Sequence, residues 1–294
     1  MNNFLFLGGD LRSVYAAKRL SERYDCFIYG FDNVPAPVCN TPVLREITKF
    51  KSLVLPLPSC RDGININAPY SRAPLPLSVI PEAVDAGGTV YCGKSCPEIA
   101  AICDENNLTL VDYFEREELI IMNAMATAEG TLEILIREQP LTIFGSLILL
   151  TGFGRISKVL AKYLTALGAI VTVTARKYSD LAWAEIAGCK TLHLSELDSA
   201  LREFDTVINT VPSPLFDTEK INRLKTGCLF IDLASESSVE EPEKIKREHI
   251  NFIHALSIPG KSSPVTAGYI VADTIINILS ETTEHKNTGG NSNA

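Results

Sequence analysis

The stretch Leu147-Ile-Leu-Leu-Thr-Gly152-Phe-Gly154-Arg-Ile-Ser157 passes from an apolar run through two spaced glycines into the start of an amphipathic segment. Apolar residues then recur at helical spacing as far as Leu167, and residues 170–174 form a second apolar run. This order of strand, glycine-rich turn, helix and strand is typical of a dinucleotide-binding βαβ unit. It predicts a Rossmann-type domain in the second half of the chain.

The two glycines have separate tasks in such a turn. Gly152 permits the tight turn, and Gly154 lets a pyrophosphate approach the backbone, where the first N–H groups of the next helix donate hydrogen bonds. The third position of the pattern holds Ser157 instead of Gly or Ala, which slightly loosens the packing of helix on strand. The alternative interpretation is a tight turn in an unrelated α/β domain.

The end of the second apolar run indicates which cofactor binds. An NAD enzyme carries an acid there for the ribose 2′-hydroxyl, whereas this chain has Arg176 and Lys177, which suit the 2′-phosphate of NADP. The alternatives are NAD as the cofactor, with the two cations as solvated loop charges. Residues 209–212 and 232–235 end later runs and are expected beside the nicotinamide half. The predicted cofactor contacts are Gly152, Gly154, Arg155, Ile156, Arg176, Lys177, Thr210, Val211, Pro212, Ala234 and Ser235.

Short apolar runs alternate with amphipathic segments in both halves, a pattern that favours parallel sheets covered by helices. With 294 residues and 46% hydrophobic content, two cores are expected. We therefore predict an α/β fold of two Rossmann-like, doubly wound parallel-sheet domains with an interdomain cleft. The runs lie at 4–7, 26–31, 53–57, 89–91 and 108–111, and then at 147–151, 170–174, 191–194, 206–210, 229–232 and 252–255.

The expected organisation has four parts. Residues 1–125 form an N-terminal substrate-side domain, and residues 126–263 form the NAD(P)-binding domain. A helix over 264–281 returns to pack on the first domain, and the polar residues 282–294 form a disordered tail. The first domain opens with Gly8-Gly9-Asp10, which lacks the second spaced glycine and places a carboxylate where a phosphate would lie. It is therefore expected to bind substrate instead of a second dinucleotide.

Composition excludes several classes of function. A net charge of −8 and a pI near 5.2 argue against general binding to nucleic acid or acidic membranes. No run approaches the roughly 20 apolar residues of a membrane span, and no signal peptide is evident, so we expect a soluble cytoplasmic protein. The eight cysteines are scattered, as reduced thiols in a cytosol would be. Cys92, Cys96 and Cys103 cluster without a paired C-x-x-C or a nearby His, so no metal site is predicted.

Several segments in this order resemble the dipicolinate synthase A subunit family. The resemblance covers nearly all the chain except its tail. Its most specific parts are the Glu-Arg-Glu, Thr-Ala-Glu-Gly and Pro-Gly-Lys segments. The matching segments are Gly8-Gly9-Asp10-x-Arg12, Leu55-Pro56, Phe114-Glu115-Arg116-Glu117, Asn123, Thr127-Ala128-Glu129-Gly130, Gly152-x-Gly154-Arg155, Ala175-Arg176, Asn209-Thr210-x-Pro212, Asp232-Leu-Ala-Ser235, Pro259-Gly260-Lys261 and Pro264-x-Thr266-Ala267-Gly268.

The resemblance implies an activity and a partner. The activity is oxidation of a dihydrodipicolinate-level intermediate, from a branch of lysine biosynthesis, to pyridine-2,6-dicarboxylate during sporulation, with hydride passing to NAD(P)⁺. The implied partner is a dipicolinate synthase B subunit, and a homo-oligomer is also expected. Two departures from the family's pattern matter. Residues 236–241 replace an Arg-Pro-Gly-Gly-like continuation, which leaves the cofactor contacts there open, and Ala126 replaces an expected Pro.

A dicarboxylate substrate requires cations, and three lie in matched motifs. Arg12, Arg116 and Lys261 are the candidates for substrate contact, although surface charges or interdomain salt bridges would explain them equally. Asn123 and Thr127 are further substrate-binding candidates. Glu129 and Lys261 are the catalytic candidates, with Glu129 as proton acceptor or helix-positioning group. His193 and His254 lie within strand patterns and are expected to be satisfied core residues instead of bases.

Two other functions are also compatible with the sequence. One is a different small-acid NAD(P) dehydrogenase of hydroxyacid or alanine type, and the absence of a His-Glu pair after the fifth strand argues against the hydroxyacid type. The other is a catalytically silent dinucleotide-binding protein that regulates a second protein.

Overall fold

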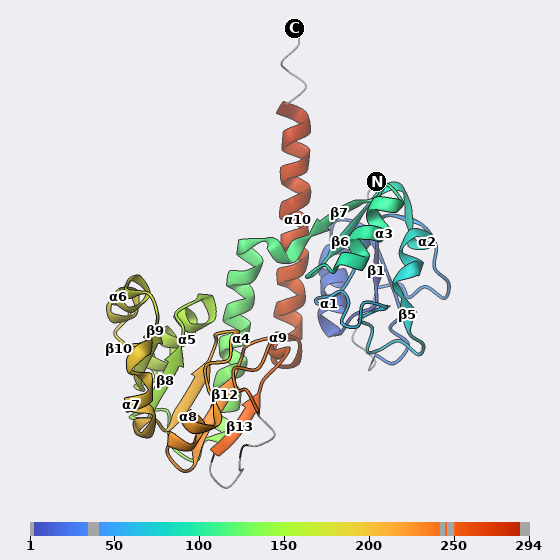
Figure 1. The fold of residues 1–294 in the computed structure, drawn as a ribbon. Helices are drawn as coiled ribbons and strands as arrows, with labels where there is room; N and C mark the ends of the chain where they lie inside the picture. Colours follow the sequence, from blue (N-terminus) through green and yellow to red (C-terminus); the bar gives the residue numbers. More distant parts are fainter. Residues whose placement is uncertain (1–2, 35–40, 242–244, 246–249, 289–294) are drawn as a thin grey trace. The chain divides into compact units, whose positions relative to one another are not determined.

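The computed structural model describes residues 3–34, 41–241, 245 and 250–288, and the chain divides into two compact units (Figure 1). Unit 1 comprises residues 1–123 and 263–294, and unit 2 comprises residues 124–262. Helix α4 (Glu117–Glu138) continues across the boundary between them. Each unit is built on its own parallel sheet, as the alternating apolar runs predict.

Unit 1 contains a parallel sheet in the order β2-β1-β3-β6-β7. In a doubly wound sheet of this order, the direction of winding reverses between β1 and β3. A short antiparallel pair, β4 with β5, lies outside this sheet. The elements are β1 (Asn3–Leu7), α1 (Leu11–Leu20), β2 (Asp25–Tyr29), β3 (Phe50–Val54), β4 (Asn65–Ile66), β5 (Leu75–Pro76), η1 (Leu77–Val79), α2 (Ile80–Ala83), β6 (Val84–Cys92), α3 (Pro97–Glu105), β7 (Thr109–Asp112), η2 (Tyr113–Glu115) and α10 (Pro264–Thr288).

Helix α10 returns from the far end of the sequence to pack along α1 (Figure 1). Its Gly268 lies against the α1 backbone, because a Cβ at this position would be 2.5 Å from the carbonyl oxygen of Arg12. Val271 and Ile275 of α10 are buried in the same cluster as Val14 of α1. The small residue and the apolar face therefore fix α10 as a helix of the first unit's core.

Unit 2 contains a parallel sheet in the order β10-β9-β8-β11-β12-β13, the strand order of a dinucleotide-binding Rossmann domain. Its strands are β8 (Leu147–Thr151), β9 (Ile170–Ala175), β10 (Lys190–His193), β11 (Thr206–Asn209), β12 (Cys228–Asp232) and β13 (Ile250–His254). Its helices, besides the second part of α4, are α5 (Arg155–Ala166), α6 (Tyr178–Ile186), η3 (Leu194–Glu196), α7 (Leu197–Ala200), η4 (Leu201–Glu203), α8 (Thr218–Arg223) and α9 (Ile258–Ser262).

Helices cover both faces of this second sheet. Leu160 and Leu164 of α5 are buried with Ile148 and Leu150 of β8, on one face. Leu149, the residue between those two on β8, is buried on the other face with Leu197 of α7. Alternate residues of one strand thus enter different cores, as expected for a strand buried on both sides. The α/β fold of two parallel sheets predicted from the sequence is confirmed.

Two local expectations were wrong. The predicted disordered tail begins at residue 282, but α10 continues to Thr288, and its Thr282 hydroxyl donates to the carbonyl of Ile278 at 2.8 Å. An established helix extends at little cost, since each added residue gains one backbone hydrogen bond. Residues 289–294 of that prediction lie outside the described residues. The sequence also suggests no segment of membrane-spanning length. Helix α4 is nevertheless long and apolar enough to cross a membrane, by length and composition alone, although half of its most apolar 18-residue stretch is buried.

Candidate functional site

The glycine turn after β8 has the geometry that its sequence predicts. Gly152 has φ +78°, a left-handed conformation, and its N–H donates to the carbonyl of Thr174 at 2.8 Å. A Cβ on Gly152 would lie 2.7 Å from Cγ2 of Val211. Gly154 has an ordinary φ of −78° and precedes α5, and a Cβ there would meet no atom within 4 Å. The backbone therefore requires glycine at 152, while Gly154 keeps the approach to the first turn of α5 open.

Ser157, at the third position of the turn, is fully buried and bonded. Its hydroxyl lies 2.9 Å from the hydroxyl of Thr210, which in turn donates to the carbonyl of Thr151 at 2.8 Å. Ser157 is then the donor to Thr210. The serine thus links α5 to the loop after β11, so the packing is held by hydrogen bonds where the sequence suggested a looser contact.

Asp232, the last residue of β12, organises the neighbouring strand ends. Its carboxylate is completely buried and accepts hydrogen bonds from the side chain of Asn209 at 2.8 Å and the N–H of Ala234 at 3.2 Å. It also accepts from the N–H of Ser238 at 2.7 Å, and from the hydroxyls of Ser238 and Ser237 at 2.9 and 3.4 Å. Ser237 and Ser238 belong to residues 236–241, the loop that departs from the family's pattern. The two serines therefore hold that loop against the sheet.

The two cations predicted to recognise a 2′-phosphate follow β9 directly. Arg176 and Lys177 are both exposed, and neither makes an ion pair within the described parts of the chain. Asp180 is near them in sequence, in the first turn of α6. The Glu196 carboxylate instead accepts from the N–H of His193, the last residue of β10, at 3.2 Å. The arrangement leaves both cations available to an anionic group at the carboxyl end of β9.

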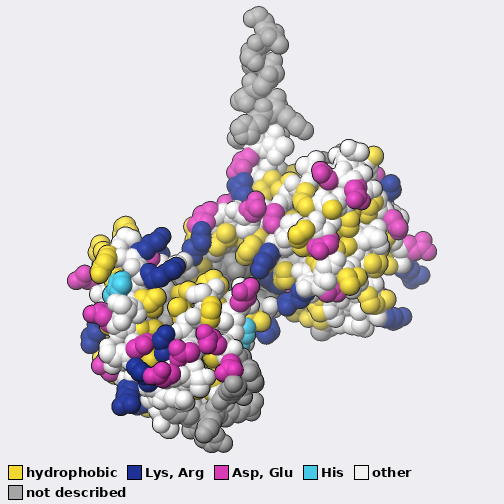
Figure 2. Space-filling view, in the orientation of Figure 1, with side chains coloured by type: hydrophobic (Ala, Val, Ile, Leu, Met, Phe, Trp, Pro, Cys, Tyr) yellow, Lys and Arg dark blue, Asp and Glu magenta, His cyan; other side chains and the backbone are white. Residues whose placement is uncertain are grey.

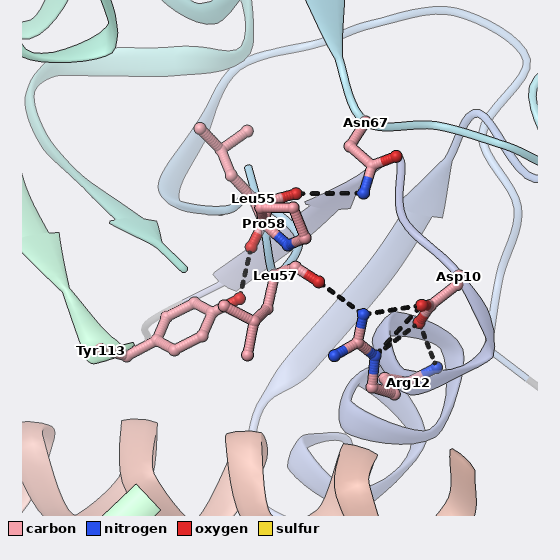
Figure 3. A network of polar contacts seen from close by, with 7 residues as sticks. All are labelled: Asp10, Arg12, Leu55, Leu57, Pro58, Asn67 and Tyr113. Carbon is pink, nitrogen blue, oxygen red and sulfur yellow. Dashed lines mark hydrogen bonds and ion pairs between the residues drawn. The ribbon is translucent and has the colours of Figure 1, made fainter. Parts of the chain in front are cut away.

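Arg12, predicted to bind substrate, is held by its own unit (Figure 3). Its guanidinium donates to the carboxylate of Asp10 through Nε at 3.0 Å and Nη2 at 2.8 Å, and Nη2 also donates to the carbonyl of Leu57. The surrounding strand ends are bonded to each other as well, since the hydroxyl of Tyr113 donates to the Leu55 carbonyl at 2.8 Å. Most of the hydrogen-bonding capacity of Arg12 is therefore used within its own unit, and its side chain is only 10% exposed.

Arg116 is also engaged in ion pairs. It binds both carboxylate oxygens of Glu281 on α10, at 2.6 and 2.7 Å, and the carboxylate of Glu118 at 2.8 Å. These bonds, those to Glu281 first, raise the pKa of the guanidinium. The fork thus joins the beginning of α4 to α10, and the charge of Arg116 is already balanced.

The segments that carry the two catalytic candidates meet in unit 2. A Cβ on Gly130 of α4 would lie 2.2 Å from Ile258 and 2.6 Å from the hydroxyl of Ser262, both in α9. The glycine therefore lets α4 and α9 touch, which brings the Thr-Ala-Glu-Gly and Pro-Gly-Lys segments together. Glu129 and Lys261 are both exposed, and no partner of either is found among the described residues. Thr127 is buried and Asn123 is half-buried, both on α4.

The expectation that His193 and His254 are core residues was wrong. His193 and His254 are the last residues of β10 and β13, and neither is buried. Nε2 of His254 donates to the carbonyl of Ala234 at 2.9 Å, and Nε2 of His193 donates to the carbonyl of Arg176 at 3.2 Å. Position at a strand's carboxyl end was the available signal, because polar side chains there face the ligand side of a parallel sheet.

Two members of the cysteine cluster, Cys92 and Cys103, are buried. Burial raises the pKa of the Cys92 thiol to about 12, and it raises that of Cys103 as well. A thiol with a raised pKa is a poor nucleophile and a poor metal ligand at neutral pH. Across the described residues, no three His, Cys, Asp or Glu side chains are placed to hold a metal ion.

Comparison with protein families matches each unit separately. Residues 3–114 match the N-terminal domain of the dipicolinate synthase A subunit. Residues 122–248 match the NAD-binding domain of D-isomer specific 2-hydroxyacid dehydrogenases. The second unit is therefore a nicotinamide dinucleotide-binding domain of dehydrogenase type, in agreement with the glycine turn and the strand order.

Individual relatives match over nearly the whole chain. The dipicolinate synthase A subunit of Bacillus subtilis (strain 168) is 28% identical over 94% of this chain and 95% of its own. The solved structure of the dipicolinate synthase A subunit from Bacillus halodurans has a TM-score of 0.83 and 27% identity, covering 95% of this chain and 97% of that one. The dipicolinate synthase A chain from Bacillus subtilis also has a TM-score of 0.83, with 26% identity and 97% coverage of both chains.

Proposed function

The chain belongs to the dipicolinate synthase A subunit family, and we propose that it oxidises a dihydrodipicolinate-level intermediate to pyridine-2,6-dicarboxylate, with NADP⁺ preferred as hydride acceptor. The observation that carries the proposal is the joint presence of both units in one chain. The first matches a domain described for dipicolinate synthase, and the second binds a dinucleotide. We propose that it acts as a soluble protein in the cytoplasm of spore-forming cells.

The residues present fit the cofactor. The open space at Gly154 and the start of α5 would receive the pyrophosphate, and the ends of β11 and β12 would border the nicotinamide half. When bound, the oxidised nicotinamide supplies the acceptor for hydride. The chain's own tasks are to position the two rings and to accept the proton released when the product becomes aromatic. Glu129 remains our candidate for that proton, since its carboxylate is exposed beside the α4–α9 contact.

The preference for NADP gives a direct prediction. Changing both Arg176 and Lys177 to Ala should weaken NADP binding by at least roughly 10- to 100-fold, because the loss of even one charge-assisted hydrogen bond costs about 1.5–3 kcal/mol. NAD affinity should stay within about twofold, because NAD has no 2′-phosphate. Isothermal titration of both cofactors measures this. The matched control is Lys190→Ala. Lys190 is a cation at the first residue of β10, away from the carboxyl end where His193 lies. An equal loss for both cofactors would show that the cations do not read the 2′-phosphate.

Lys261 is our leading candidate for a substrate carboxylate. Arg12 and Arg116 are already paired with acids, whereas Lys261 is exposed and without a partner in the described chain. Lys261→Met should lower kcat/KM by roughly 10- to 100-fold, the loss expected for one charge-assisted hydrogen bond. Cofactor affinity, measured by titration, should not change. A normal kcat/KM, or a loss confined to cofactor binding, would return the role to Arg12 and Arg116.

A partner is part of the proposal, because the relatives are named as one of the subunits of an enzyme. We propose that this chain, itself a homo-oligomer, assembles with a dipicolinate synthase B subunit. Turnover of dihydrodipicolinate by the purified chain, with and without the B subunit, tests the proposal. Turnover in either case supports it. No turnover but oxidation of a 2-hydroxy acid or alanine would favour the second candidate, a small-acid dehydrogenase, which the match of residues 122–248 supports.

A further inference from the structure

Two aromatic side chains stack at the outer end of the second sheet. His193 ends β10, and Tyr178 begins α6, shortly after β9. Strands β9 and β10 pair so that His193 lies beside Ala175, the residue before Arg176. The Tyr178 and His193 rings are 5.0 Å apart between centroids and only 18° from parallel. In Figure 2, hydrophobic side chains and a His side chain lie together at the surface over α6.

Hydrogen bonds on both sides hold the inner ring of this pair. Nε2 of His193 donates to the carbonyl of Arg176 at 3.2 Å. Nδ1 lies 2.7 Å from the hydroxyl of Ser195 and accepts from the Ser195 N–H at 3.4 Å. The carbonyl can only accept, so the proton is on Nε2 and Nδ1 is the acceptor. Because both ring nitrogens are engaged, His193 offers Tyr178 a fixed surface.

The outer ring is left open to solvent. Tyr178 is 75% exposed although one face of its ring is covered by His193. It lies directly after Arg176 and Lys177, whose charges are unpaired among the residues described. A planar aromatic face beside two cations matches a ligand that carries a planar ring and a phosphate.

The strand order indicates which end of the dinucleotide lies here. The pyrophosphate turn follows β8, at the centre of the sheet, and β9 and β10 lie on the opposite side of β8 from β11 and β12. A dinucleotide extends to both sides of this central strand. With the nicotinamide half at β11 and β12, the adenosine half extends toward β9 and β10.

We propose that Tyr178, supported by His193, is the platform on which the adenine ring of the cofactor stacks. This inference rests on the proposed function, since it presumes that the chain binds a nicotinamide dinucleotide. It divides the adenosine site in two: Tyr178 reads the base, which NAD and NADP share, and Arg176 with Lys177 reads the 2′-phosphate, which only NADP carries.

The test is isothermal titration of the full chain with NADP, NAD and ADP-ribose. Tyr178→Ala should weaken all three by a common factor of roughly 5- to 100-fold, the usual effect of removing one base-stacking side chain. Tyr178→Phe should restore affinity, because the ring is kept. His193→Ala should cause a smaller common loss, since Tyr178 loses its support. Trp183→Ala is the matched control, an aromatic residue of the same helix that is 61% exposed, and it should leave all three affinities unchanged.

The outcomes separate this inference from the proposed function. If the unmodified chain binds no dinucleotide, the proposed function itself fails. If it binds and Tyr178→Ala leaves the affinities unchanged, the platform is wrong. A change in oligomeric state in Tyr178→Ala and Trp183→Ala, with normal affinity, would make the exposed surface of α6 a protein contact instead. A loss for NADP alone would assign Tyr178 to the phosphate and likewise overturn the inference.

Discussion

Gly154→Val should reduce dinucleotide affinity by roughly 100-fold or more, about 2.7 kcal/mol, and leave the fold intact. The backbone at this position has a φ of −78°, which any residue adopts, and a Cβ meets no atom within 4 Å. The free protein therefore accommodates the new side chain without strain. The same empty space is the approach to the first turn of α5, so valine fills the volume that the pyrophosphate needs.

Affinity by titration and the circular dichroism spectrum should be measured together. Gly152→Val provides the contrast, because its φ of +78° and the nearness of Val211 make that substitution strained in the free protein. It should lose stability, whereas Gly154→Val loses binding alone. A well-folded Gly154→Val variant that still binds NADP would reduce the glycine motif to a simple turn.

Asp232→Ala should destabilise the chain by about 3 kcal/mol or more. The substitution removes the acceptor of five hydrogen bonds in a completely buried setting, and each unsatisfied buried donor costs about 1–3 kcal/mol unless the structure relaxes. The loop after β12 and the Asn209 side chain both lose their anchor. Dinucleotide affinity should fall as well, because these strand ends border the proposed nicotinamide site.

The stability change can be read from the midpoint of urea unfolding. Glu236→Ala is the matched control, an exposed carboxylate in the same loop, and its effect should stay within about 0.5 kcal/mol. The explanation fails if Asp232→Ala unfolds at the same urea concentration as the unmodified chain, since the hydrogen bonds would then contribute nothing net.

Much of the fold was accessible from sequence because its signals are local. The six apolar runs of the second half match β8 to β13 within two residues at either end, and the glycine turn was placed correctly. Strand order is not a local property. The sequence does not contain a local signal that β10 lies at one edge of the sheet and β13 at the other, and this order comes from the structure.

The side-chain partners were less accessible, because they come from distant parts of the chain. Arg116 is paired with Glu281, which lies 165 residues away, and Arg12 donates to a carbonyl that lies 45 residues away. The sequence alone therefore predicts that both arginines are available for substrate. In the sequence Asp232 is recognisable only as a strand end, since the serines that bind it belong to a loop with no recognisable motif.

The most direct test of the whole account is the stoichiometry of one reaction. The purified chain, supplied with the B subunit if needed, is mixed with dihydrodipicolinate and NADP⁺, and NADPH is followed by its absorbance while pyridine-2,6-dicarboxylate is quantified by chromatography. We expect the two products to appear in equal amounts, because each ring that becomes aromatic gives one hydride to the cofactor. Formation of pyridine-2,6-dicarboxylate without NADPH or NADH, or no formation above the uncatalysed rate, would contradict the account.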